Sequence, residues 1–113
     1  MIDQNNKQLL IKKLQTCLPE ASILASAEEL RPYECDGLSA YQELPLLVVM
    51  PETIEQVQAI VRVCASMEVP VVARGAGTGL SGGALPLSNG ILLSLAKFNR
   101  IIDIDQLNRT ALV

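Results

Sequence analysis

The chain has 113 residues, of which 50% are hydrophobic and only 3% aromatic, so its core must be largely aliphatic. This length suits one small domain or part of a larger one. The net charge of −3, without a basic stripe interleaved with aromatic residues, argues against nucleic acid as a partner. Because the chain has no histidine, Ser-His-Asp and Cys-His catalysis are excluded within it.

The N-terminal region is expected to be helix followed by loop. Residues 3–18 predict a helix, because leucines recur there at four-residue spacing. Asp3 can cap the helix and Pro19 can end it. Ser26 begins a capping-box pattern, and residues 33–41 have no period, which indicates a loop.

A βαβ unit is predicted next. Residues 46–50 form a continuous apolar run, which is typical of a strand buried on both faces. Thr53 and Gln56 fit a capping box, so a helix is expected to begin there and to end near Met67. Residues 69–73 supply the next strand, and the two strands are expected to be parallel.

Further short strands are expected at residues 91–95, 101–104 and 110–113. The predicted fold class is therefore α+β: an N-terminal helix, a βαβ unit and further short strands. The last apolar run has no stop signal, so we expect an incomplete subdomain. We divide the chain into a helical and loop extension, residues 1–41, and the N-terminal part of a domain, residues 42–113.

The most informative segment is residues 74–83, which hold five of the seven glycines and directly follow a predicted strand. Successive backbone amides freed of side chains can form an anion site, and Arg74 adds a positive charge. This favours a phosphate-bearing cofactor over a simple mobile turn. Residues 77–82 match G-x-G-x-x-G, but glycines and Pro86 break the helix that a Rossmann site requires.

Three segments carry a family resemblance. Residues 70–84, Pro-Val-Val-Ala-Arg-Gly-Ala-Gly-Thr-Gly-Leu-Ser-Gly-Gly-Ala, resemble the pyrophosphate loop of the vanillyl-alcohol-oxidase (PCMH) type of FAD-binding domain. Residues 48–53, Val-Val-Met-Pro-Glu-Thr, are similar to the opening βαβ unit of that family. Residues 31–41, Arg-Pro-Tyr-Glu-Cys-Asp-Gly-Leu-Ser-Ala-Tyr, resemble more specifically the family of glycolate oxidase FAD-linked subunits and D-lactate dehydrogenases. The resemblance covers nearly the whole chain.

The resemblance implies that FAD is the cofactor and that residues 74–83, the glycine loop, wrap its pyrophosphate. Backbone amides would donate to the phosphate oxygens, Thr78 and Ser81 would add hydroxyl donors, and Pro51 would help to line the adenine end. Some family members attach flavin through a histidine near the position of Thr78; this chain has none, so FAD is expected to be non-covalent. The implied cofactor-binding residues are Pro51, Arg74, Gly75, Ala76, Gly77, Thr78, Gly79, Leu80, Ser81, Gly82 and Gly83.

The activity implied by the resemblance is oxidation of a small 2-hydroxy acid, glycolate or D-lactate, by hydride transfer to FAD. The substrate-binding cap would lie outside these residues, so no catalytic residue and no metal ligand is expected within residues 1–113, and these residues alone are not expected to be active. Two alternatives stay open. One is an FAD oxidase of the same superfamily acting on another alcohol or a sugar lactone, and the other is a truncated, non-catalytic remnant.

The implied partners are the 2-hydroxy acid and other glycolate oxidase subunits. Three widely spaced cysteines without a C-x-x-C pair favour a reducing compartment. No apolar run is long enough to span a bilayer. We therefore expect a cytoplasmic location, with peripheral attachment at the inner face of the membrane as an open alternative.

Overall fold

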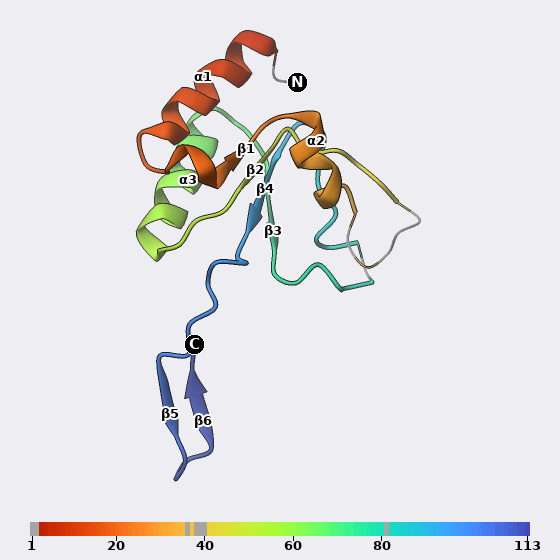
Figure 1. Cartoon of the computed structure of the whole chain (residues 1–113). Helices are drawn as coiled ribbons and strands as arrows, with labels where there is room; N and C mark the ends of the chain where they lie inside the picture. Colours follow the sequence, from red (N-terminus) through yellow and green to blue (C-terminus); the bar gives the residue numbers. More distant parts are fainter. Residues whose placement is uncertain (1–2, 36, 38–40, 81) are drawn as a thin grey trace.

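The computed structural model describes residues 3–35, 37, 41–80 and 82–113. A four-stranded sheet of order β1-β2-β4-β3 forms the centre, and β5 and β6 form a separate two-stranded sheet (Figure 1). The helical segments are α1 (Gln4–Gln15), η1 (Glu20–Ser22), α2 (Ala27–Leu30), η2 (Arg31–Tyr33) and α3 (Ile54–Ser66). The strands are β1 (Ile23–Leu24), β2 (Leu47–Val49), β3 (Val71–Arg74), β4 (Ile91–Ser94), β5 (Asp103–Asp105) and β6 (Thr110–Leu112).

The predicted N-terminal cap is confirmed. The carboxylate of Asp3 accepts a hydrogen bond of 2.8 Å from the backbone N–H of Asn6. The helix ends at Gln15, earlier than the leucine spacing suggests, and Leu18 is still buried because the following turn folds it back onto the core. The predicted capping box at Ser26 is also present and begins α2.

Side chains on the two central strands alternate between two apolar layers. The layer beneath α1 and α3 contains Leu10, Leu14, Leu18, Leu47, Val49, Ile60, Cys64, Val69, Ile91 and Leu93. The opposite layer, near α2, contains Leu30, Val48 and Leu92. Burial on both faces explains why the strand sequences are continuously apolar rather than alternating. Figure 1 shows α1 and α3 on one side of the sheet and α2 on the other.

The topology refines the predicted βαβ unit. As expected, β2 and β3 run parallel in one sheet, but β4 lies between them and pairs in parallel with both. The two-residue strand β1 pairs antiparallel with the outer side of β2. The sequence does not predict β1, since two residues are too few to produce a pattern.

The start of α3 differs in one respect from a capping box. The Thr53 hydroxyl accepts a hydrogen bond of 3.2 Å from the backbone N–H of Gln56, as expected. The Gln56 side chain does not return to Thr53: its Oε1 accepts from the backbone N–H of Glu52 at 2.7 Å. This bond ties the first turn of α3 to the loop that follows β2.

The end of α3 is a Schellman motif without glycine. The backbone N–H of Val69 donates to the carbonyl of Cys64 at 2.9 Å, and that of Glu68 donates to Ala65 at 3.3 Å. Glu68 has φ 55°, in the left-handed region where glycine is usual. Val69 and Cys64 both lie in the core, which supplies the apolar contact that accompanies this motif.

The hairpin β5–β6 stands away from the central sheet (Figure 1). Its turn is closed by Asp105, whose carboxylate accepts from the backbone N–H groups of Leu107 and Asn108, each at 3.1 Å. The side-chain amide of Asn108 also donates to it, and these bonds lower the pKa of Asp105. The exposed apolar side chains of this region are Ile101, Ile102, Ile104, Leu107, Leu112 and Val113.

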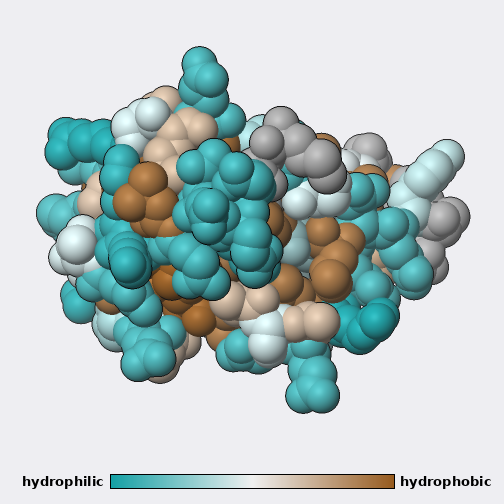
Figure 2. Space-filling model, turned by 90° about the horizontal axis from the view of Figure 1, so that it is seen from above, coloured by the Kyte–Doolittle hydropathy of each residue, from teal (hydrophilic) through white to brown (hydrophobic). Residues whose placement is uncertain are grey.

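Seen from above, the molecule is mostly hydrophilic, with apolar side chains in small groups between polar ones (Figure 2). The described residues contain no helix with the length and apolar character needed to cross a membrane.

Candidate functional site

The candidate site lies where three parallel strands end. Because β2, β4 and β3 are parallel, the loops after Val49, Ser94 and Arg74 leave the sheet at one edge. In open sheets of this kind, ligands bind outside the carboxyl ends of the strands. Register pairs Arg74 with Ser94, so the glycine loop and the segment after β4 begin side by side.

A pocket of about 650 Å³ opens at this edge. The glycine loop contributes Arg74, Gly75 and Ala76, all of which sequence analysis predicts to be site residues. The rest of the lining is Pro32, Tyr33, Ser94, Leu95, Ala96 and Phe98, which sequence analysis does not identify. The segment after β4 is detectable in principle, because it follows a buried parallel strand. The contribution of Pro32 and Tyr33 depends on the tertiary fold alone.

Arg74 is the last residue of β3, and its side chain packs against the glycine loop. Its residue is only 6% exposed. The guanidinium Nη2 donates a hydrogen bond of 2.8 Å to the carbonyl of Ala84, across the base of the loop. The Nε atom is buried and has no hydrogen-bond partner in the part of the chain that the structure describes. No carboxylate of the described residues forms an ion pair with Arg74, so none of them neutralises this buried positive charge.

The glycines of the loop have two distinct roles. Gly77 has φ 74° and Gly82 has φ 76°, so both require the conformational freedom of glycine. A Cβ on Gly77 would also lie 3.2 Å from Cδ of Arg74, so this glycine packs directly over the arginine stem. At Gly75, Gly79 and Gly83 a Cβ would meet nothing within 4 Å, which leaves open space beside the backbone.

The other predicted site residues lie in different parts of the structure, and not all of them reach the pocket. Thr78 is exposed and Leu80 is 70% exposed, on the outer part of the loop. Ser81 lies outside the described residues. Pro51 is fully buried where the chain leaves β2, so its side chain does not face the pocket.

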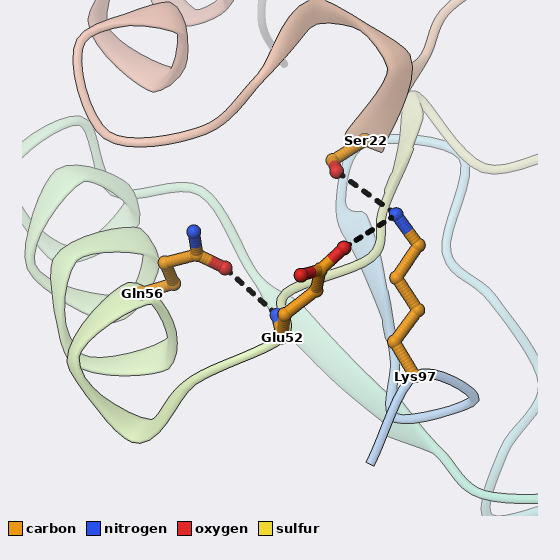
Figure 3. A network of polar contacts seen from close by, with 4 residues as sticks. All are labelled: Ser22, Glu52, Gln56 and Lys97. Carbon is orange, nitrogen blue, oxygen red and sulfur yellow. Dashed lines mark hydrogen bonds and ion pairs between the residues drawn. The ribbon is translucent and has the colours of Figure 1, made fainter. Parts of the chain in front are cut away.

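A polar network fixes the neighbouring loops (Figure 3). The ammonium of Lys97, after β4, donates to the Ser22 hydroxyl at 3.2 Å and pairs with a carboxylate oxygen of Glu52 at 3.3 Å. A second pocket of about 270 Å³ begins here, lined in part by Glu52, Lys97 and Arg100. The network joins the segment after β4 to the loop after β2, so the two walls of the edge are held together.

Cys17, Cys35 and Cys64 are free thiols. Among residues 3–35, 37, 41–80 and 82–113, no three His, Cys, Asp or Glu side chains are grouped so as to hold a metal ion. Burial, and secondarily the charge of Cys17, raises the pKa of Cys64 to about 11, so its thiol is protonated at neutral pH.

Comparison with known sequences identifies relatives of this chain. A family model described as FAD binding domain matches residues 45–113. The chain is 56% identical over 104 residues to the glycolate oxidase subunit GlcD of Escherichia coli strain K12, covering 92% of this chain and 21% of that protein. It is 32% identical over 100 residues to a D-lactate dehydrogenase of Anaerostipes hadrus, covering 88% of this chain and 21% of that protein. The chain thus spans about a fifth of the length of the curated relatives it matches.

Solved structures share the fold. A 4-ethylphenol oxidase from Gulosibacter chungangensis superposes with a TM-score of 0.82 at 22% identity, over 94% of this chain and 21% of that one. A p-cresol methylhydroxylase superposes with a TM-score of 0.77 at 23% identity, over 92% of this chain and 21% of that one. This likeness confirms the predicted α+β fold of the PCMH type.

Proposed function

The chain belongs to the FAD binding domain family, and we propose that it is the FAD-binding portion of an oxidoreductase acting on a small 2-hydroxy acid. Its cofactor is FAD. Glycolate is the first candidate substrate and D-lactate the second. The higher identity to the glycolate oxidase subunit, 56% against 32% for the D-lactate dehydrogenase, supports that order. The matched residues make up 21% of that glycolate oxidase subunit, so the substrate and the electron acceptor are proposals about a longer protein.

The observation that carries the proposal is the environment of Arg74. Among the described residues, its buried Nε has no hydrogen-bond partner and its charge is not matched by a carboxylate. A diphosphate would supply both the missing acceptor and the missing negative charge. The side-chain-free backbone at Gly75 and Gly79 leaves room for phosphate oxygens to approach the amides. The residues present therefore fit the group.

We assign the binding residues on this basis. Backbone amides of Gly75, Ala76, Gly77, Gly79, Leu80, Gly82 and Gly83 are proposed to donate to the diphosphate, with hydroxyl donors from Thr78 and Ser81. Arg74 contributes charge and shapes the loop. Pro51 is proposed to contribute to FAD binding by shaping the turn after β2, since its side chain is buried.

The reaction requires little covalent chemistry from these residues. When bound, FAD supplies the acceptor for a hydride from the α-carbon of the 2-hydroxy acid. The residues of this chain bind and orient the diphosphate. We assign no catalytic residue within residues 1–113. FAD is proposed to be non-covalent, because the chain has no histidine to which it could be attached.

We further propose that residues 1–41 form an N-terminal extension to the domain portion at residues 42–113, and that the protein works in the cytoplasm with other oxidase subunits. The three free thiols support a reducing compartment.

Titration of the purified protein with FAD and with riboflavin tests the binding role. FAD should bind at least about tenfold more tightly, since only FAD carries the diphosphate and one charge-assisted hydrogen bond is worth about 1.5–3 kcal/mol. Acid denaturation should release intact FAD. Equal affinities would contradict the loop assignment, whereas failure to bind FAD would favour a non-catalytic remnant. Anaerobic reduction of bound FAD by glycolate and by D-lactate then distinguishes the substrates.

A further inference from the structure

A second glycine, distant in sequence, lies against the glycine loop. A Cβ built on Gly37 would clash with the carbonyl oxygen of Thr78 and would lie 2.7 Å from the carbonyl oxygen of Gly79. Both atoms belong to the backbone, so neither can move aside by a change of rotamer. At this point glycine is required for the close approach of two backbones. From this contact we infer that Gly37 is a positioning residue for the glycine loop and its bound diphosphate. This inference rests on the proposed function.

The contact covers one edge of the loop backbone. The three atoms nearest to the Gly37 Cβ position are the carbonyl oxygen and carbon of Thr78 and the oxygen of Gly79. The chain has no cis peptide bonds among its described residues, and in a planar trans peptide the N–H lies on the edge opposite the C=O. The amides of Gly79 and Leu80 therefore lie on the edge that Gly37 leaves free. Gly37 thus determines which edge of these two peptides is available to an anion.

The free edge has room for a ligand. A Cβ on Gly79 would meet nothing within 4 Å, in contrast to the crowded position at Gly37. The loop is therefore supported on one side and open on the other. Consecutive amides presented in this way are a recurrent means of binding phosphate oxygens.

Described residues on both sides of Gly37 make contacts that anchor them. The Tyr33 side chain packs against the core cluster that contains Leu30 and Leu92, and it lines the same pocket as Arg74. The backbone N–H of Glu43 donates a hydrogen bond of 2.7 Å to the carbonyl of Glu34. Described residues on both sides of Gly37 are therefore fixed, Tyr33 to the core and Glu34 to Glu43.

Gly37→Ala tests the inference, because one added methyl must displace the Thr78–Gly79 peptide. The affinity for FAD should fall by about tenfold or more, while the affinity for riboflavin, which lacks phosphate, changes by less than about twofold. The ratio of the two affinities is the readout that a purely structural role would not move. An unchanged FAD affinity would overturn the inference, and so would equal losses for both flavins. If the wild-type protein does not bind FAD, the proposed function fails instead.

Gly90→Ala is the matched control. A Cβ there would lie 2.8 Å from the backbone oxygen of Pro70, at the opposite end of β3 and β4 from the glycine loop. This variant should lose thermal stability and keep the wild-type ratio of FAD to riboflavin affinity. If Gly37→Ala does not fold, amide hydrogen exchange of the wild-type protein replaces it. Residues 34–43 should gain protection with FAD but not with riboflavin, and equal protection with both would overturn the inference.

Discussion

The ammonium of Lys97 lies 3.2 Å from the hydroxyl oxygen of the buried Ser22, a contact between residues 75 positions apart in the chain. Ser22 directly precedes β1, and its carbonyl accepts a hydrogen bond from the backbone N–H of Met50, which follows β2. Lys97 therefore connects the segment after β4 with the outer edge of the sheet. The same ammonium pairs with Glu52, so one side chain holds three segments together.

Lys97→Met should destabilise the protein by about 1 kcal/mol, because the buried Ser22 hydroxyl loses its partner. The half-exposed pair with Glu52 adds less than about 1 kcal/mol. Thermal denaturation should show a loss of about 4 °C in Tm. Lys12→Met, on the exposed side of α1, is the matched control and should change Tm little. Equal effects of the two variants would show that the Ser22 contact contributes nothing to stability.

Gly77→Val should abolish FAD binding under the proposed function. A β-branched residue at φ 74° is strained, and its Cβ would press on the stem of Arg74 at 3.2 Å. Gly75→Ala provides a graded comparison, because a Cβ there meets nothing within 4 Å and φ is not in the left-handed region. FAD titration of both variants should give a much smaller loss for Gly75→Ala. Wild-type flavin content in Gly77→Val would contradict the diphosphate assignment.

The sequence predicts local elements well because each has its own signal. The apolar runs of β2 and β4, and the side-chain caps at Asp3 and Thr53, are confirmed within a few residues. What the sequence does not predict depends on contacts between distant segments. The insertion of β4 between its neighbours, the pairing of β1, and the contact of Gly37 with Thr78 all join residues far apart in the chain.

The candidate site shows the same division. The run of glycines indicates where an anion would bind, whereas the position of Arg74 follows from its bond to Ala84 and its packing beneath Gly77. Neither contact produces a sequence pattern. Pro32 and Tyr33 likewise reach the pocket only through the turn of η2.

Glu68→Gly should stabilise the protein by up to about 1 kcal/mol. Glu68 occupies the left-handed position of the Schellman motif at the end of α3, where a side chain costs about 1–2 kcal/mol and glycine does not. Part of this gain is offset by the greater entropy of glycine in the unfolded chain. Chemical denaturation measures the difference. Glu55→Gly, within the first turn of the same helix, should have the opposite sign, and a loss of stability in both variants would contradict the strain at residue 68.

Arg74→Lys should keep the positive charge and still weaken FAD binding by about tenfold, because an ammonium cannot reproduce the planar fork of the guanidinium. In the wild-type protein Nη2 donates to the carbonyl of Ala84, while Nε, which has no partner among the described residues, is proposed to donate to a phosphate oxygen. The ratio of FAD to riboflavin affinity is again the measurement. Arg62→Lys, on the exposed face of α3, is the matched control and should retain the wild-type ratio. A wild-type ratio in Arg74→Lys would show that charge alone is sufficient.

The raised pKa of the Cys64 thiol predicts that the protein loses stability at alkaline pH. This thiol has a pKa raised from the ordinary value of 9.0 to about 11, chiefly by burial. Between these values the unfolded chain has released the proton and the folded protein retains it, so the unfolded state binds fewer protons and the free energy of unfolding falls as pH rises. The contribution is complete below pH 9 and is lost progressively toward pH 11.

Cys64→Ala should therefore flatten the pH dependence of the unfolding free energy between pH 9 and 11, even though it lowers stability at neutral pH by removing buried volume. Urea denaturation at a series of pH values measures the slope. Val69→Ala, which creates a cavity in the same core cluster without removing a titrating group, should lower stability throughout and keep the wild-type slope. If both variants keep that slope, the buried thiol does not control the alkaline transition.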